Sequence, residues 1–301
     1  MKNLLLLLIL VFSASALAQV DPTVTLDPTT RNYIIRYQGH EGEDQNPAIV
    51  ERIFEPSTKI NPHVNARVSK DSLQFRYTYG ITNDIASMQR IIEFDVKVVS
   101  NPGQVTGPSD SWRFSSFSFA PIFGWYSSKG EAGLSDSLDG IAPGSTEEGF
   151  SFSSDGLPGF VNSYLRGKPS SILSFPDEPP GEIARLLKPL RKFPNNTVIR
   201  RTLGPVSPPA QFIPLAFLDT LISYKHQAFA LGWIREEGIV TSLDAKLEAV
   251  RPQIIADRPS AKNILQSFIN ELDALNSQGD QITSEAYALL KFNAQYLMSK
   301  L

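Results

Sequence analysis

The spacing of apolar residues changes once along this chain, from every second residue to every third or fourth. In the segment RIIEFDVKVVS, the apolar Ile92, Phe94 and Val96 alternate with charged residues. This period of two is typical of a strand with one buried face. From Phe217 onward, apolar residues recur instead at the spacing of an amphipathic helix. The change predicts a multi-domain fold that is all-β in its first part and all-α in its last.

The β-rich part is predicted to be an immunoglobulin-like sandwich. In SLQFRYTYGITN, the residues Phe75, Tyr77 and Tyr79 fall on one face of an alternating segment. Asn-Pro-Gly, Pro-Gly and Asp-Gly spacers between such segments favour tight turns. Roughly seven or eight short strands between Val24 and Thr202, with no long helix among them, match the pattern of such a sandwich.

Four helices are predicted after the last β segment. Gly232 and Gly279 are placed to end helices in the left-handed conformation that glycine favours. Thr241 and Thr283 are candidate N-caps, and Pro252 marks the expected end of the second helix. Helices of this length are marginally stable alone, so their apolar stripes are expected to pack together as a four-helix bundle.

These patterns predict four consecutive parts. Prolines 205, 208 and 209 indicate a semi-rigid connector between the β-rich and helical parts. The predicted parts are a signal peptide (1–18), a β-sandwich domain (19–204), a Pro-rich linker (205–214) and a helical bundle (215–301).

The N-terminal residues have the pattern of an export signal. A basic Lys2 precedes the apolar run 4–12, and Ala16 and Ala18 form an A-x-A cleavage site. The run is too short to span a bilayer, and no later stretch approaches about 20 apolar residues. We therefore expect cleavage between Ala18 and Gln19 and a secreted or periplasmic mature protein with no membrane span.

Composition excludes some classes of protein. Cysteine is absent, so neither disulfides nor a lipid-modified N-terminal cysteine is expected, as in many exported bacterial proteins. The 28 basic and 31 acidic residues give a net charge of −3, one unit more negative once Lys2 is removed with the signal. This mild acidity argues against a general nucleic-acid binder.

No catalytic constellation is found in the sequence. His40, His63 and His226 lie far apart, and none has the spacing of a metal ligand. Nucleophile-elbow and phosphate-loop motifs are absent, so no cofactor and no metal is expected. Pairs of nearby carboxylates remain as candidate catalytic groups. A glycosidase needs two carboxyl groups that face each other across a cleft. They are Glu41 with Glu43 and Asp44, Asp136 with Asp139, Glu147 with Glu148, and Glu236 with Glu237.

Aromatic residues near the middle of the β-rich part have two interpretations. Trp112, Trp125 and Tyr126 either fill the sandwich core or form a platform on which sugar rings stack. Trp125 and Tyr126 follow Gly124 in an expected loop, which makes this pair the candidate for exposure.

A basic cluster precedes the connector. It could contact an anionic polysaccharide, a lipid head group or an acidic partner, or it could be a solvated face or a contact with the helical part. Its members are Arg185, Lys188, Arg191, Lys192, Arg200 and Arg201.

Several short runs carry family resemblances. In the helical part these are Ser242-Leu243-x-Ala245-Lys246-Leu247, Phe268-Ile269-Asn270, and Thr283 with Ala286 and Leu289-Leu290. On these runs, residues 215–301 resemble the FIMAH-type helical module of secreted bacterial proteins. The resemblance implies a C-terminal appendage that mediates attachment or interaction, with no assigned reaction. Trp233 and the long turn 276–281 depart from it. The stretch IAPGSTEEGFSF loosely resembles bacterial extracellular immunoglobulin-like domains.

The sequence thus favours a non-enzymatic exported interaction protein, with a cell-surface or extracellular polysaccharide or another exported protein as partner. One alternative is a carbohydrate-active hydrolase that uses a carboxylate pair on the sandwich. A further alternative is a structural spacer within a larger assembly.

Overall fold

The fold comes from a computed structural model of the chain. It describes residues 20–41, 46–71, 74–99, 102–116, 121–127, 140–176 and 178–301. The predicted signal peptide and its cleavage site lie outside these ranges and stay predictions. Glu43, Asp44, Asp136 and Asp139 of the predicted carboxylate pairs also lie outside the described residues.

The chain divides into two compact units. The first contains the residues up to Glu55 together with Ser171–Leu190, and the second contains Pro56–Ser170 together with Arg191–Leu301. The chain therefore leaves the first unit after its third strand and contributes one later segment to it.

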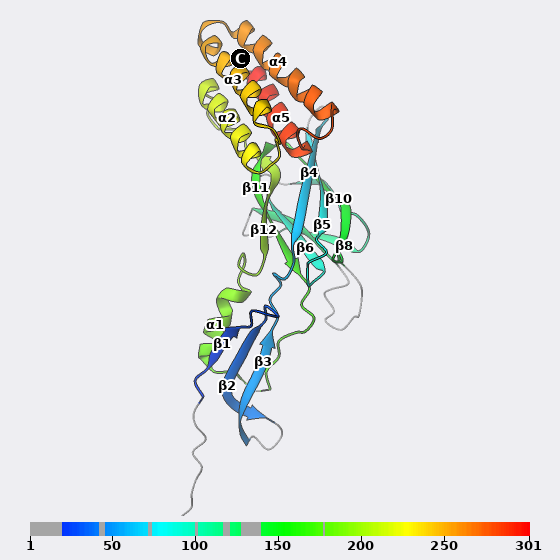
Figure 1. Cartoon of the computed structure of the whole chain (residues 1–301), viewed down its shortest axis with the longest axis vertical. Coiled ribbons are helices and arrows are strands. Elements are labelled where there is room, and N and C mark those ends of the chain that lie inside the picture. Colours follow the sequence, from blue (N-terminus) through cyan, green and yellow to red (C-terminus); the bar gives the residue numbers. More distant parts are fainter. Residues whose placement is uncertain are drawn as a thin grey trace, which may run out of the picture. The chain divides into compact units, whose positions relative to one another are not determined.

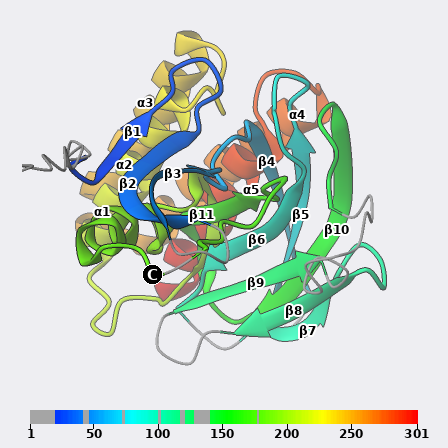
Figure 2. The same cartoon turned by 90° about the horizontal axis from the view of Figure 1, so that it is seen from below.

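The described residues of the first unit form a three-stranded antiparallel sheet and one helix. Its strands, in the order β1-β2-β3, are β1 (Thr23–Leu26), β2 (Tyr33–Glu41) and β3 (Asn46–Phe54). Helix α1 (Gly181–Arg191) lies beside β2 (Figure 2). The core of this unit consists of Ile35, Tyr37, Val50, Ile183 and Leu187. Strand periodicity alone does not say which strands share a sheet, so the sequence did not predict this separate core.

The second unit contains two antiparallel sheets (Figure 1). The four-stranded sheet has the order β4 (Pro62–Lys70), β5 (Phe75–Asn83), β10 (Ser145–Ser154) and β7 (Gly103–Thr106). The five-stranded sheet has the order β12 (Val198–Val206), β11 (Leu157–Gly167), β6 (Ile91–Lys97), β9 (Ile122–Ser127) and β8 (Trp112–Ser116).

Aromatic side chains from the two sheets meet in the core between them. Tyr79 of β5 lies edge-on to Phe94 of β6, with ring centroids 5.3 Å apart. Trp125 of β9 stacks on Phe94 at 5.6 Å, and Phe150 of β10 contacts both rings. The apolar alternation predicted for β5 and β6 is confirmed, since Tyr77, Tyr79 and Phe94 are fully buried.

A helical region follows β12. It contains α2 (Pro214–Ala230), α3 (Glu237–Ala256), α4 (Arg258–Ser277) and α5 (Ser284–Lys300). Gly232 and Gly279 follow α2 and α4 with positive φ angles of 72° and 92°. Thr283 caps α5 as predicted, because its hydroxyl accepts the Ala286 N–H at 3.4 Å.

The start and end predicted for α3 are wrong. Thr241 is not its N-cap, because the helix already begins at Glu237 and the Thr241 hydroxyl donates to the Glu237 carbonyl at 3.0 Å. The helix also continues past Pro252 to Ala256. Ile254 is buried one turn beyond Val250, and this burial offsets the hydrogen bond that a proline removes.

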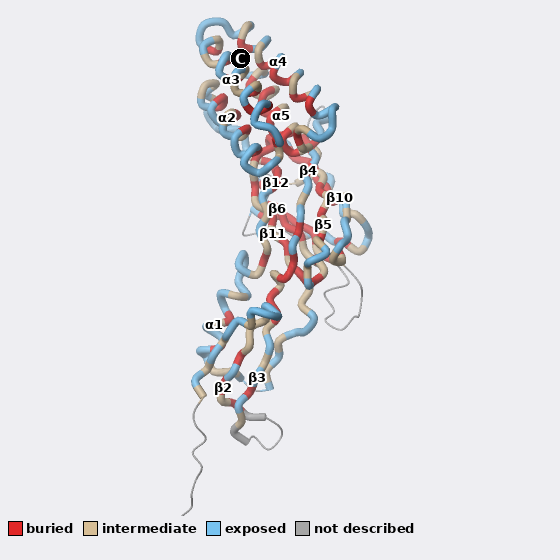
Figure 3. The backbone as a smooth tube through the Cα atoms, in the orientation of Figure 1, coloured by how far each residue is buried: buried red, intermediate tan, exposed pale blue. Residues whose placement is uncertain are grey.

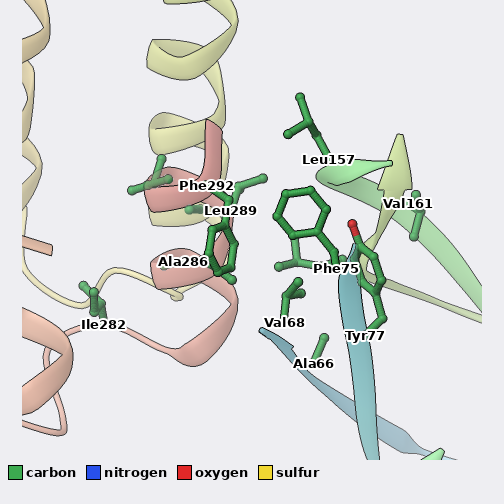
Figure 4. Packing of buried hydrophobic residues seen from close by; sticks show 14 of the residues in the cluster. Ala66, Val68, Phe75, Tyr77, Leu157, Val161, Ile282, Ala286, Leu289 and Phe292 are labelled. Carbon is green, nitrogen blue, oxygen red and sulfur yellow. The ribbon is translucent and has the colours of Figure 1, made fainter. Parts of the chain in front are cut away.

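Helix α5 joins the helical region to both sheets. Glu285 Oε1 accepts the Ala66 N–H of edge strand β4 at 2.6 Å, and the Ser284 hydroxyl donates to the Ala66 carbonyl at 2.9 Å. Phe292 meets Phe75 edge-on at 5.3 Å (Figure 4), and Asn293 donates to the Pro158 carbonyl of β11 at 2.8 Å.

One hydrophobic core therefore runs from the two sheets into the helices. Figure 3 shows buried positions continuing from the strands of this unit into α2–α5. Residues on both sides of the predicted boundaries at 204 and 214 belong to this one core. Whether the segments on either side fold independently stays a prediction.

Candidate ligand-binding face

Trp125 does not occupy the exposed loop that was predicted for it. It lies within strand β9 with 1 % of its surface exposed, and its indole N–H donates to the Thr106 carbonyl at 3.0 Å. Trp112 is also buried, with its ring 4.9 Å from that of Phe150. The core interpretation is confirmed for both tryptophans, and the exposed interpretation of Trp125 is wrong.

Gly124 misled the prediction because it is a strand glycine and not a turn. A Cβ atom at this position would lie 1.9 Å from Asp95 Oδ1 and 2.5 Å from the Phe94 carbonyl oxygen. The Asp95 carboxyl therefore occupies the space above Gly124. Glycine is required here so that an acidic side chain can lie flat on the sheet.

Tyr126 points to the opposite side of β9 from Trp125, because successive strand residues alternate in direction. This side of the five-stranded sheet faces away from the four-stranded sheet, and we call it the outer face. Tyr126 is paired with Glu93, and Glu93 with Arg166. The polar and aromatic side chains of the outer face are Glu93, Asp95 and Lys97 of β6, Arg113 of β8, Tyr126 of β9, Phe160, Asn162, Tyr164 and Arg166 of β11, and Arg201 of β12.

Two acidic groups lie side by side at the centre of the outer face. Asp95 has 2 % of its surface exposed, and burial followed by the charge of Glu93 raises the pKa of Asp95 to about 8. Asp95 therefore keeps its proton at neutral pH and is hydrogen-bonded to Glu93. Glu93 forms an ion pair with Arg166. The sequence missed this pair, because Glu93 and Asp95 stand at alternating positions that predict solvated side chains.

The predicted carboxylate pairs within the described residues do not form such a site. Glu147 and Glu148 are neighbours in β10, so their side chains point to opposite faces. Burial raises the pKa of Glu147, which accepts a hydrogen bond from Trp112. Glu236 and Glu237 are exposed at the start of α3. In the described part of the chain, no group of His, Asp and Glu side chains has the arrangement of a metal site.

The predicted basic cluster is divided between the two units. Arg185 and Lys188 belong to the first unit, where Arg185 pairs with Glu182 at 3.0 Å. Arg191, Lys192, Arg200 and Arg201 belong to the second. Arg200 donates to the Pro62 carbonyl at 2.8 Å and to Asn61 Oδ1 at 3.1 Å. Of the six residues, Arg201 is the one that the strand register places on the outer face, opposite Asn162.

Polar contacts join neighbouring helices of the C-terminal region. Glu271 of α4 accepts from the Ser242 hydroxyl and from the Lys246 ammonium of α3, each at 2.7 Å. Asp273 of α4 accepts from the Lys291 ammonium of α5 at 2.6 Å. Ser242, Lys246 and Glu271, the residue after Phe268-Ile269-Asn270, thus form one contact between α3 and α4.

Residues 221–299 match the FIMAH domain model. The predicted resemblance of the C-terminal region is therefore confirmed. FIMAH is a family of non-catalytic modules. The chain matches no curated protein. Within the described ranges, no helix has both the length and the apolar character that a bilayer crossing requires.

The FIMAH domain contains one fully buried cation. Lys225 of α2 forms an ion pair with Asp244 of α3, and burial lowers the pKa of Lys225 to about 8. His226 is exposed, with its Nε2 3.7 Å from Asp244. The amine of Lys225 is closed off from solvent, so we assign it to helix packing and not to chemistry on a ligand.

The FIMAH domain meets the outer face at an aromatic contact. Trp233, which departs from the family resemblance, stacks on Phe160 of β11 with ring centroids 5.1 Å apart. Tyr224 of α2 lies edge-on to the same ring at 5.6 Å. The Arg201 guanidinium lies 5.3 Å from the Phe160 centroid and donates to Asn162 Oδ1 at 3.2 Å. One end of the outer face is therefore formed jointly by the sheet and the FIMAH domain.

Proposed function

We propose that this protein is a non-enzymatic, exported interaction protein that binds an extracellular polysaccharide on the outer face. The observation that carries the proposal is the alternation of aromatic and hydrogen-bonding side chains across one side of a sheet. Tyr126, Glu93 and Arg166 form one cross-strand row, and Tyr164 and Asp95 form the next. Partly exposed aromatic rings beside fixed polar groups suit the apolar faces and hydroxyl groups of sugars.

The proposal also covers the fold of each part of the chain and the export of the protein from the cytoplasm. We assign the two sheets of the second unit to an immunoglobulin-like sandwich and α2–α5 to a four-helix bundle. Cleavage after Ala18 would release the mature protein into the periplasm or the medium. The FIMAH match over residues 221–299 supports the export part of this proposal only through the resemblance of this segment to modules of secreted bacterial proteins.

The hydrolase alternative receives less support from the outer face. Glycosidases hold their two carboxyl groups about 5 to 10 Å apart, on either side of the scissile bond. Glu93 and Asp95 are hydrogen-bonded to each other, which leaves no room for a sugar linkage between them. The spacer alternative predicts an outer face with no ligand, and the binding experiment below separates it from the proposal.

The experiment is a glycan array probed with the full chain, followed by titration of the best ligand. We expect Tyr126→Ala and Tyr164→Ala each to weaken binding about tenfold, because loss of a stacking ring removes roughly 1 kcal/mol or more. Phe229→Ala is the matched control, since Phe229 is an exposed aromatic residue on α2. Equal binding by all three variants, or no glycan bound by the parent protein, would contradict the proposal.

A further inference from the structure

We infer that the polysaccharide bound at the outer face is acidic, with carboxylate groups along its chain. This inference rests on the proposed function and narrows it to one class of ligand. Two observations support it: the outer face has a positive net charge, and two of its arginines lie next to aromatic residues.

The outer face has an excess of positive charge, although the chain as a whole carries −3. Glu93 is neutralised by its ion pair with Arg166, and Asp95 is buried beside it. Lys97, Arg113 and Arg201 are exposed, and none of them forms an ion pair with any described residue. The local sign is therefore opposite to that of the whole chain, which favours an anionic ligand on this side.

Two of these cations each adjoin an aromatic ring. Arg113 of β8 is paired directly with Tyr126 of β9. Arg201 lies over Phe160 at the other end of the outer face. A sugar ring stacked on Tyr126 would place its substituents beside the Arg113 guanidinium. Phe160 is covered by Trp233, so at this end the Arg201 guanidinium is the group that a ligand would contact. Arginine binds carboxylates with two parallel hydrogen bonds, so an acidic sugar is the ligand that uses both Tyr126 and Arg113 and that a second carboxylate joins to Arg201.

The distance between the two aromatic–arginine pairs indicates an extended ligand. Tyr126, Glu93 and Arg166 lie in one cross-strand row, because Glu93 is paired with both of the others. Phe160 lies six positions before Arg166 on β11. Strand residues advance about 3.3 Å each, so the two pairs are roughly 20 Å apart. Tyr164 lies between them. A polymer of several acidic sugars spans this length, whereas a single acidic group would contact only one end.

The experiment compares three polymers by affinity electrophoresis and titration with the full chain. They are polygalacturonate, the same polymer after reduction of its carboxyl groups, and poly-glutamate. We expect the chain to bind polygalacturonate at least tenfold more tightly than either of the others. We also expect this binding to weaken between about 50 and 500 mM salt, because screening reduces charge attraction.

Variants assign the effect to the outer face. Arg113→Gln and Arg201→Gln should each weaken binding of polygalacturonate several-fold and reduce its salt dependence. Arg67→Gln, an exposed arginine on β4 of the other sheet, should leave binding unchanged. Circular dichroism melts of each variant check that the fold is retained.

The outcomes separate the two proposals. Equal binding of the reduced polymer would overturn the acidic class while leaving polysaccharide binding in place. Poly-glutamate bound as tightly as polygalacturonate would show that charge alone is recognised and would overturn the saccharide. If none of the polymers and no glycan on the array binds, both proposals fail.

Discussion

Asp95 is a buried acid on a strand whose polar positions were expected to face water. It fits because Gly124 leaves space for its carboxyl and Glu93 shares its proton. Retaining this proton at neutral pH makes the folded state sensitive to pH. It also removes a negative charge from a surface where cations are in excess.

Replacing Asp95 with asparagine should remove this pH dependence. The folded-state pKa of about 8 lies above the ordinary value of 3.8, so the folded protein binds the extra proton between these limits. Unfolding releases that proton, and the free energy of unfolding should fall as pH rises through this window, by at most about 1.4 kcal/mol per unit. Asp95→Asn stays neutral, so its stability relative to the parent should increase with pH.

Urea unfolding at pH 5, 6, 7 and 8 measures this difference. Asp110→Asn is the control, because Asp110 is exposed in the same unit. A stability difference between Asp95→Asn and the parent that did not change with pH would show that Asp95 ionises normally.

At the scale of elements, sequence patterns predicted strands and caps better than features that depend on tertiary contacts. The apolar alternation in β5 and β6 and the N-cap at Thr283 were predicted correctly. Both depend on residues that are close together in the sequence. Trp125 was misplaced because glycine before an aromatic pair resembles a turn, whereas a cross-strand carboxyl required the glycine. The end of α3 was misplaced because burial of Ile254, a tertiary contact, outweighs the local effect of Pro252. The outer face escaped prediction for the same reason, since its residues are brought together only by strand register.

Glu285 is the element-scale contact that a single substitution can remove. Glu285→Ala leaves the buried Ala66 N–H of β4 without its acceptor, which should lower the free energy of unfolding by about 1 to 3 kcal/mol. Glu237→Ala removes a glutamate from the first turn of α3, where it is exposed, and should cost well under 1 kcal/mol. Urea titrations of both variants give the comparison. Equal losses would mean that the bond to β4 contributes nothing beyond the helix-dipole effect.

At the scale of the whole molecule, the FIMAH domain completes the hydrophobic core of its unit. Phe292 contacts Phe75 of β5, Asn293 donates to the Pro158 carbonyl of β11, and Trp233 covers Phe160. The sequence predicted where helices replace strands along the chain. It could not predict that the two parts share a core, because the apolar stripe of α5 has the same spacing whether it meets helices or strands.

Expression of residues 205–301 alone tests whether the helical region folds independently. The segment should melt about 10 °C or more below the full chain, because the surface of α5 that covers β4 and β11 becomes exposed. Thermal melts followed by circular dichroism at 222 nm make the measurement. A segment as stable as the full chain would restore the predicted boundary as a true domain border.

The bond between Glu285 and Ala66 connects positions 219 residues apart. Recombination that transferred the C-terminal segment to another host would carry away a helix end fitted to one particular strand. The donor protein would be left with an uncovered sheet margin, open to pairing with a neighbouring molecule. Inheritance of these two distant stretches should therefore be linked.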